Sequence, residues 1–105
     1  MSKKKESLKE GQKAQRKKYD FRQALMETGI DHFEEVDIRK SVGNNVHRLT
    51  RDIGIDELSR KVYHDGVVEL TDEEARIFCI LLQSDNCDMN IAATQAAVRI
   101  LTNKD

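Results

Sequence analysis

The chain has 105 residues and no proline, a length that fits one small domain with a single, thin core. Apolar residues make up 38%, aromatic residues 5% and charged residues 35%, so the core has to be built mainly from aliphatic side chains. No apolar run approaches the roughly 20 residues that span a bilayer, and the N-terminus lacks the apolar region of a secretory signal, so we expect neither a membrane-spanning nor a secreted protein. We therefore expect a cytoplasmic protein whose two cysteines, Cys79 and Cys87, are reduced thiols.

The formal charge of −1 hides an uneven distribution of charge along the chain. Residues 1–18 carry eight Lys or Arg against two Glu, a net charge of +6 that leaves −7 for residues 19–105. This composition predicts a disordered basic tail over residues 1–18, followed by one domain over residues 19–105. Three roles fit such a tail: it binds a polyanion, it folds back on its own acidic domain, or it keeps the protein soluble.

The first predicted element of the domain is a short helix over residues 19–29. Phe21, Ala24, Leu25 and Thr28 recur at helical intervals, and Gly29 is a natural residue to follow a helix end. Residues 30–38 fit neither the helical nor the strand period, so we expect a loop or a helical turn there.

The clearest pattern lies over residues 39–54, where apolar residues recur at intervals of four, three and four. These residues are Val42, Val46, Leu49 and Ile53, and Gly54 ends the run. The pattern predicts an amphipathic helix, and residues 56–61 are expected to add one further helical turn.

Next, a β-hairpin is predicted over residues 61–70. The β-prone runs "KVY" and "VVEL" flank Asp65-Gly66, a dipeptide that readily adopts the positive φ of tight hairpin turns. Thr71 and Glu74 then form a capping box, which predicts a helix that starts at Asp72.

Two apolar helices complete the expected fold. The helix that starts at Asp72 is followed by a break at residues 84–90 and by a last helix over residues 91–101. Small residues in the last helix, namely Ala92, Ala93, Ala96 and Ala97, allow another helix to approach closely. The two helices are expected to form an antiparallel hairpin that is either the centre of the core or part of a homodimer interface. The predicted fold class is therefore mainly α, a small domain of about four helices with one short β-hairpin.

The helix around Val46 carries the candidate contact surface. At about 100° per residue, its apolar stripe faces one way, and a set of polar and cationic residues faces the other. This set consists of Lys40, Asn44, His47 and Arg51, with Arg48 at its edge. A cationic stripe that includes an amide is suited to lie along phosphates, although an ordinary solvated helix face has the same composition.

The stretch "VELTDEEARIFCILL" resembles the entry to the winged-helix domains of response regulators over some fifteen residues. The resemblance implies a helix-turn-helix arrangement whose final helix reads DNA. That helix offers Thr94, Gln95 and Arg99 as its obvious polar readers, too few cations for a recognition helix. No function is transferred from this resemblance.

Enzymatic signatures are weak throughout the sequence. Cys87 lies between Asp85 and Asp88, which disfavour a reactive thiolate, and His64-Asp65 has no recognisable nucleophile nearby. The three histidines follow no metal-ligand spacing, and the isolated glycines form no phosphate-cradling loop. We therefore predict no catalytic, cofactor-binding or metal-ligating residues.

These observations favour a non-enzymatic interaction or regulatory protein. Its partner is expected to be acidic, either nucleic acid or protein, and to contact the basic tail and the helix face from Lys40 to Arg51. The alternative is a homo-oligomeric assembly or adaptor protein with no nucleic-acid role.

Overall fold

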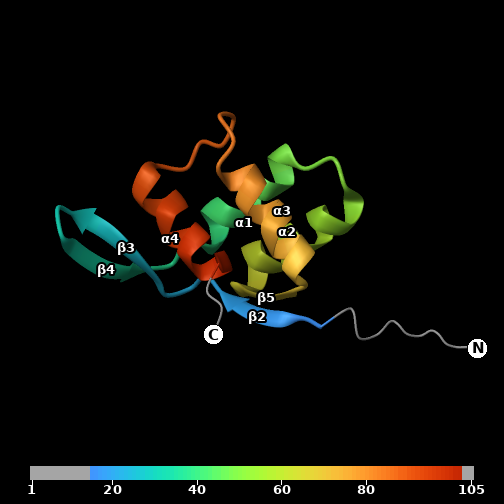
Figure 1. The fold of residues 1–105 in the computed structure, drawn as a ribbon, viewed down its shortest axis with the longest axis horizontal. Coiled ribbons are helices and arrows are strands. Elements are labelled where there is room, and N and C mark those ends of the chain that lie inside the picture. The colour runs from blue at the N-terminus through green and yellow to red at the C-terminus, as the bar shows by residue number, and fades with distance from the viewer. Residues whose placement is uncertain (1–14, 103–105) are drawn as a thin grey trace, which may run out of the picture.

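The computed structural model describes residues 15–102, which form four helices and two separate two-stranded sheets (Figure 1). In chain order the elements are β2 (Lys17–Asp20), β3 (Ala24–Gly29), β4 (His32–Val36), α1 (Arg39–Leu49), α2 (Ile53–Asp65), β5 (Val67–Leu70), α3 (Asp72–Leu82) and α4 (Ile91–Thr102).

The prediction of a mainly α domain with one short hairpin is wrong. Helices hold 53% and strands 22% of the described residues, which makes this a small α+β fold. Most of the predicted basic tail, residues 1–14, lies outside the described residues, while Lys17 and Lys18 form the start of β2.

The first sheet joins segments that are far apart in the sequence. β2 pairs with β5 in antiparallel register, from Lys17 opposite Leu70 to Asp20 opposite Val67. The predicted hairpin over residues 61–70 is therefore wrong, because its first half belongs to α2. Gly66 does adopt a positive φ of 76°, but as the residue that ends α2, where its N–H donates to the carbonyl of Val62.

The second sheet, β3 paired with β4, replaces the helix predicted over residues 19–29 and the loop predicted over residues 30–38. Ala24 is buried and Leu25 is exposed, an alternation that suits a strand. The helical spacing of apolar residues was misleading because Phe21 lies before the turn that leads into β3, so the spacing spans two different segments. At the hairpin tip, Asp31 has a φ of 60°, and its N–H donates to the Glu27 carboxylate at 2.8 Å.

The helix predicted around Val46 is confirmed as α1, with Val42 and Val46 fully buried. It ends at Leu49 rather than at Gly54. Ile53 is 79% exposed and belongs to α2, because Asp52 starts a new helix there by accepting the N–H of Ile55 at 2.9 Å. The expected single turn over residues 56–61 is thus part of a helix of 13 residues.

The predicted capping box is confirmed at the start of α3. The Thr71 hydroxyl accepts from the Glu74 N–H at 3.1 Å, and the Glu74 carboxylate accepts from the Thr71 N–H at 2.9 Å. The chain reverses its direction between α3 and α4 (Figure 1), and α4 packs on both α3 and β3. Ala96 and Ala97 are buried in these contacts within the monomer, which corrects their expected availability for a dimer interface.

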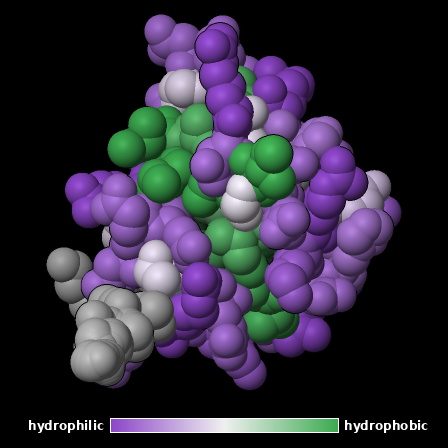
Figure 2. Space-filling model, turned by 90° about the vertical axis from the view of Figure 1, so that its right-hand side faces the viewer, coloured by the Kyte–Doolittle hydropathy of each residue, from purple (hydrophilic) through white to green (hydrophobic). Residues whose placement is uncertain are grey.

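The core lies between the β2–β5 sheet and the helices and contains two buried phenylalanines among smaller side chains. The largest side chains with almost no exposure are Phe21, Phe78, Leu70, Leu82, Val42, Val46, Val62 and Ser59. Not all apolar residues are covered, and Figure 2 shows a broken band of hydrophobic side chains among hydrophilic ones on one face. The large apolar residues that remain exposed are Leu25, Ile30, Phe33, Ile53, Ile80 and Ile91.

Candidate functional site

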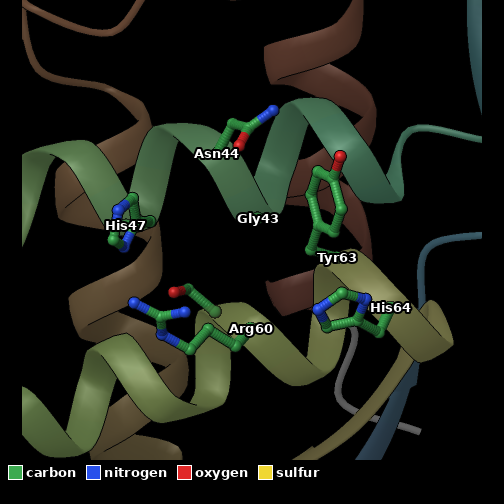
Figure 3. A pocket seen from close by; sticks show the side chains of 7 residues that line it. Gly43, Asn44, His47, Arg60, Tyr63 and His64 are labelled. Atoms are coloured by element: carbon green, nitrogen blue, oxygen red, sulfur yellow. The ribbon is translucent and has the colours of Figure 1, made fainter.

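An open groove of about 200 Å³ runs between α1 and α2 and gathers polar side chains from both helices (Figure 3). It is lined by Gly43, Asn44, His47, Ser59, Arg60, Tyr63 and His64. A second hollow adjoins it at Tyr63 and His64 and extends past Lys40 to Asp37. Tyr63 and His64 thus line both hollows.

The close approach of α1 and α2 forms the floor of this groove. A Cβ atom built on Gly43 would lie 2.8 Å from the Cβ of Tyr63 and 2.9 Å from the carbonyl oxygen of Ser59. Ser59 is fully buried opposite, and its hydroxyl donates to the carbonyl of Asp56 at 2.6 Å. Two small residues thus allow the helices to pack closely, while longer side chains from both helices form the walls.

Gly43→Ala should lower the free energy of unfolding by about 1–2 kcal/mol. The added methyl overpacks the contact with the α2 backbone, and this cost exceeds the gain of about 1 kcal/mol in helix propensity. Chemical denaturation followed by circular dichroism measures the change. The control is Gly54→Ala, where the nearest atom, the capping carboxylate oxygen of Asp52, is 3.1 Å away and no backbone atom of another helix comes close. Equal stability of Gly43→Ala and the wild type would contradict the close packing described here.

The structure places the predicted surface residues in two groups. All five are exposed, and Asn44 and His47 line the groove, with Lys40 beside it in the adjoining hollow. Arg48 and Arg51 do not join them.

Arg48 and Arg51 lie away from the groove for different reasons. Arg48 donates to the side chain of Asn45 at 2.7 Å and to the carbonyl of Asn86 at 2.9 Å, so it attaches α1 to the loop between α3 and α4. Arg51 follows the end of α1, in the connection to α2. The predicted stripe of one long helix is thus divided, and only its part between Lys40 and His47 faces the groove.

Three groove residues, Arg60, Tyr63 and His64, were missed from the sequence because α2 was predicted as a single turn over residues 56–61 followed by a hairpin. Their spacing of three and four residues places them on one side of a helix. A signal for this helix was present in the sequence. Ile55 and Val62, which are both buried, continue a helical period after the capping residue Asp52.

The one acidic side chain at the inner end of the groove, Asp56, is already occupied by neighbours. Nδ1 of His47 and Nε of Arg60 donate to its two carboxylate oxygens, the latter at 3.2 Å, and the Ser59 hydroxyl lies 3.1 Å away. The hydrogen bond from His47 is the main reason that the pKa of Asp56 is lowered. Because Arg60 and Asp56 neutralise each other, the groove offers mainly hydrogen-bond donors to a ligand, with Lys40 and Asp37 in the adjoining hollow.

Acid denaturation should report this arrangement. A folded-state pKa below the ordinary value means that ionised Asp56 stabilises the fold above about pH 4, and that this contribution is lost as the pH falls through the depressed value. In Asp56→Asn, we expect the free energy of unfolding to fall less between about pH 5 and pH 2 than in the wild type. The stability of Asp56→Asn should still fall somewhat at low pH, because Asp20 also has a lowered pKa, which its hydrogen bond from Arg22 causes. Denaturant titrations at several pH values measure how the free energy of unfolding changes with pH, and Glu57→Gln, at an exposed neighbour, is the control. If the pH dependence of Asp56→Asn equals that of the wild type, the lowered pKa of Asp56 is contradicted.

Other parts of the described surface offer weaker sites. A hollow beside β2 and α3 contains Tyr19 and Cys79, and burial raises the pKa of both, which makes the Cys79 thiol a poor nucleophile. Cys79 and Cys87 are free thiols. Between residues 15 and 102, no group of His, Cys, Asp and Glu side chains is arranged to hold a metal ion. No helix in this range has the length and apolar character needed to cross a bilayer.

The fold and the groove together define a small α+β protein with a polar, donor-rich surface between two closely packed helices. Comparison of the chain with models of known protein families, with curated protein sequences and with solved structures gives no significant match.

Proposed function

We propose that this protein is a non-enzymatic, cytoplasmic interaction or regulatory protein that binds an acidic partner in the α1–α2 groove. The observation that carries the proposal is the convergence of donors from two helices on one groove whose inner acid is already paired. Lys40 and His47 come from α1, and Arg60 and His64 come from α2. An anionic ligand would meet charge and hydrogen-bond donors from both walls at once.

The basic N-terminal sequence supports the same proposal. Residues 1–18 carry a net charge of +6, and such a segment adds sequence-independent attraction for a polyanion. Part of its charge is used within the fold, since Arg16 forms an ion pair with Glu74 at 2.6 Å and Lys17 lies 3.9 Å from Asp72. The groove is therefore proposed as the specific contact, and the basic segment as a supplementary one.

A non-catalytic role is supported by the chemistry of the groove. The one hydroxyl at its floor, that of Ser59, is fully buried and donates to a backbone carbonyl. His47 is held by Asp56, which positions its ring without a nucleophile to activate. Binding requires nothing more than the donors already described.

Fluorescence anisotropy with labelled polyanions at two salt concentrations tests the proposal. We expect salt-sensitive binding that weakens several-fold in Lys40→Ala and further in Lys40→Ala/Arg60→Ala, because fewer cations meet the ligand. The matched control is Lys61→Ala, which removes an exposed cation from α2 outside the groove. Absence of binding at low salt, or equal losses in Lys40→Ala and Lys61→Ala, would reject the groove as the contact surface.

Self-association as an assembly or adaptor protein is the second candidate function. It is favoured by the outward side of α3, where Ile80 is 61% exposed opposite the buried Phe78 and Leu82. Light scattering coupled to size exclusion should then give a defined oligomer that Ile80→Glu converts to monomer, while Ile91→Glu on α4 leaves the mass unchanged. A monomeric mass for the wild type over a wide concentration range would reject this candidate.

A further inference from the structure

The side chain of Tyr63 gives the groove a second chemical character besides charge. Tyr63 is partly exposed and lies where the two hollows meet. The ammonium group of Lys40 is 5.8 Å from the centroid of its ring, and the His64 ring packs edge-on against it at 5.1 Å with an interplanar angle of 81°. An aromatic side chain held in this way presents a flat apolar surface inside a cationic groove.

The backbone position of Tyr63 is fixed by the packing of the two helices. Its Cα and Cβ lie against Gly43, where any side chain on α1 would collide with them. Figure 3 shows the Tyr63 side chain beside α1, with His64 next to it on α2 and Asn44 on α1. The ring thus lies beside α1, in contact with the ammonium of Lys40 and the His64 ring.

Cations beside an aromatic ring form the combination that binds single-stranded nucleic acid, in which cations follow the phosphates and aromatic rings stack on the bases. We propose that the α1–α2 groove binds single-stranded DNA or RNA, with one base stacked on Tyr63 and the flanking phosphates on Lys40 and Arg60. This inference rests on the proposed function and specifies its partner. Asn44, exposed on the opposite wall, is placed to hydrogen-bond with the stacked base.

The geometry disfavours the other polyanions. A duplex presents its bases already stacked and enclosed, so it offers no free base face to the Tyr63 ring. A poly-glutamate chain supplies charge without flat rings, so stacking on the Tyr63 ring would add nothing to its affinity. Stacking on the Tyr63 ring therefore favours single-stranded nucleic acid over the other polyanions, whereas the cations attract all of them.

The test compares ligands that differ only in their bases. Labelled oligo-dT and oligo-rU are titrated beside an abasic phosphodiester oligomer of the same length, a DNA duplex and poly-glutamate. We expect the two single strands to bind more tightly than the other three ligands. In Tyr63→Leu, affinity for the single strands should fall by about 5- to 150-fold, the range of one base–aromatic stack, while binding of the abasic oligomer is unchanged.

Two further variants separate stacking from a general loss of structure. Tyr63→Phe keeps the ring and should restore single-strand binding to near the wild-type level, whereas Lys40→Ala should weaken the single strands and the abasic oligomer alike. Circular dichroism of each variant shows whether the fold is intact. The inference is overturned if the abasic oligomer or poly-glutamate binds as tightly as oligo-dT, or if a folded Tyr63→Leu binds single strands normally. In those cases salt-sensitive binding lost in Lys40→Ala would still support the acidic-partner proposal, whereas no binding of any polyanion would reject both.

Discussion

Phe21→Ala should lower the free energy of unfolding by about 3–5 kcal/mol, the largest effect expected of any single substitution discussed here. The Phe21 side chain has no exposure to solvent and fills the core between β2 and β3. Its backbone also connects elements, since its N–H donates to the carbonyl of Gly66 at 2.8 Å and its carbonyl accepts from Ile38 at 2.9 Å. A small core with few aromatic side chains cannot close around the cavity that alanine would leave.

Urea denaturation followed by circular dichroism gives the change in stability for Phe21→Ala. Phe33→Ala is the matched control, because it is the same substitution at a residue that is 45% exposed. It should cost about 1 kcal/mol or less, mainly through its contact with Arg99, whose guanidinium is 5.7 Å from the ring centroid. A similar cost for the two substitutions would mean that Phe21 does not fill the core as described.

Asn45→Ala is expected to cost about 2–3 kcal/mol through the loss of a buried polar connection. Asn45 is 4% exposed, and its amide donates to the carbonyl of Ser41 at 2.9 Å. Its side-chain oxygen accepts from Arg48 at 2.7 Å and from the N–H of Asp88 at 3.0 Å. Alanine would remove the acceptor of both of these donors and leave the loop over residues 83–90 attached to α1 through the bond from Arg48 to the carbonyl of Asn86.

Denaturation and limited proteolysis together test the role of Asn45. Cleavage within residues 83–90 should become faster in Asn45→Ala, because the loop loses one of its two attachments to α1. Asn44→Ala is the control: the neighbouring side chain is exposed in the groove, so stability and cleavage should both stay near wild-type values. Slow cleavage in Asn45→Ala at unchanged stability would show that the loop is held by other contacts.

The elements that the sequence predicted correctly are those determined by local signals. α1 has apolar residues at helical spacing on one face, and α3 starts at a capping box that needs only Thr71 and Glu74. The strands were missed because their partners are remote or because the spacing of apolar residues coincided with that of a helix. Nothing local in Lys17–Asp20 indicates a strand, since that segment gains its hydrogen bonds from β5 some fifty residues later.

About half of the candidate groove could be inferred from the sequence for the same reason. Lys40, Asn44 and His47 follow from the period of α1 alone. Arg60 and Tyr63 required α2 to be recognised, and the β-prone "KVY" run and Gly66 favoured a hairpin instead. Gly66 adopts a positive φ both in such a turn and at a helix end, so the residue itself could not decide between them.

The pairing of β2 with β5 can form only late in the synthesis of the chain. A ribosome has already released Lys17 when it adds Leu70, the residue opposite it in the sheet, so β2 must wait unpaired while the intervening chain emerges. The β3–β4 hairpin and α1 contain only neighbouring residues and are able to form during that interval. Until β5 is available, Tyr19 and Phe21 cannot reach the buried positions that they have in the folded protein. We expect the nascent protein to be most prone to chaperone binding and aggregation at this stage.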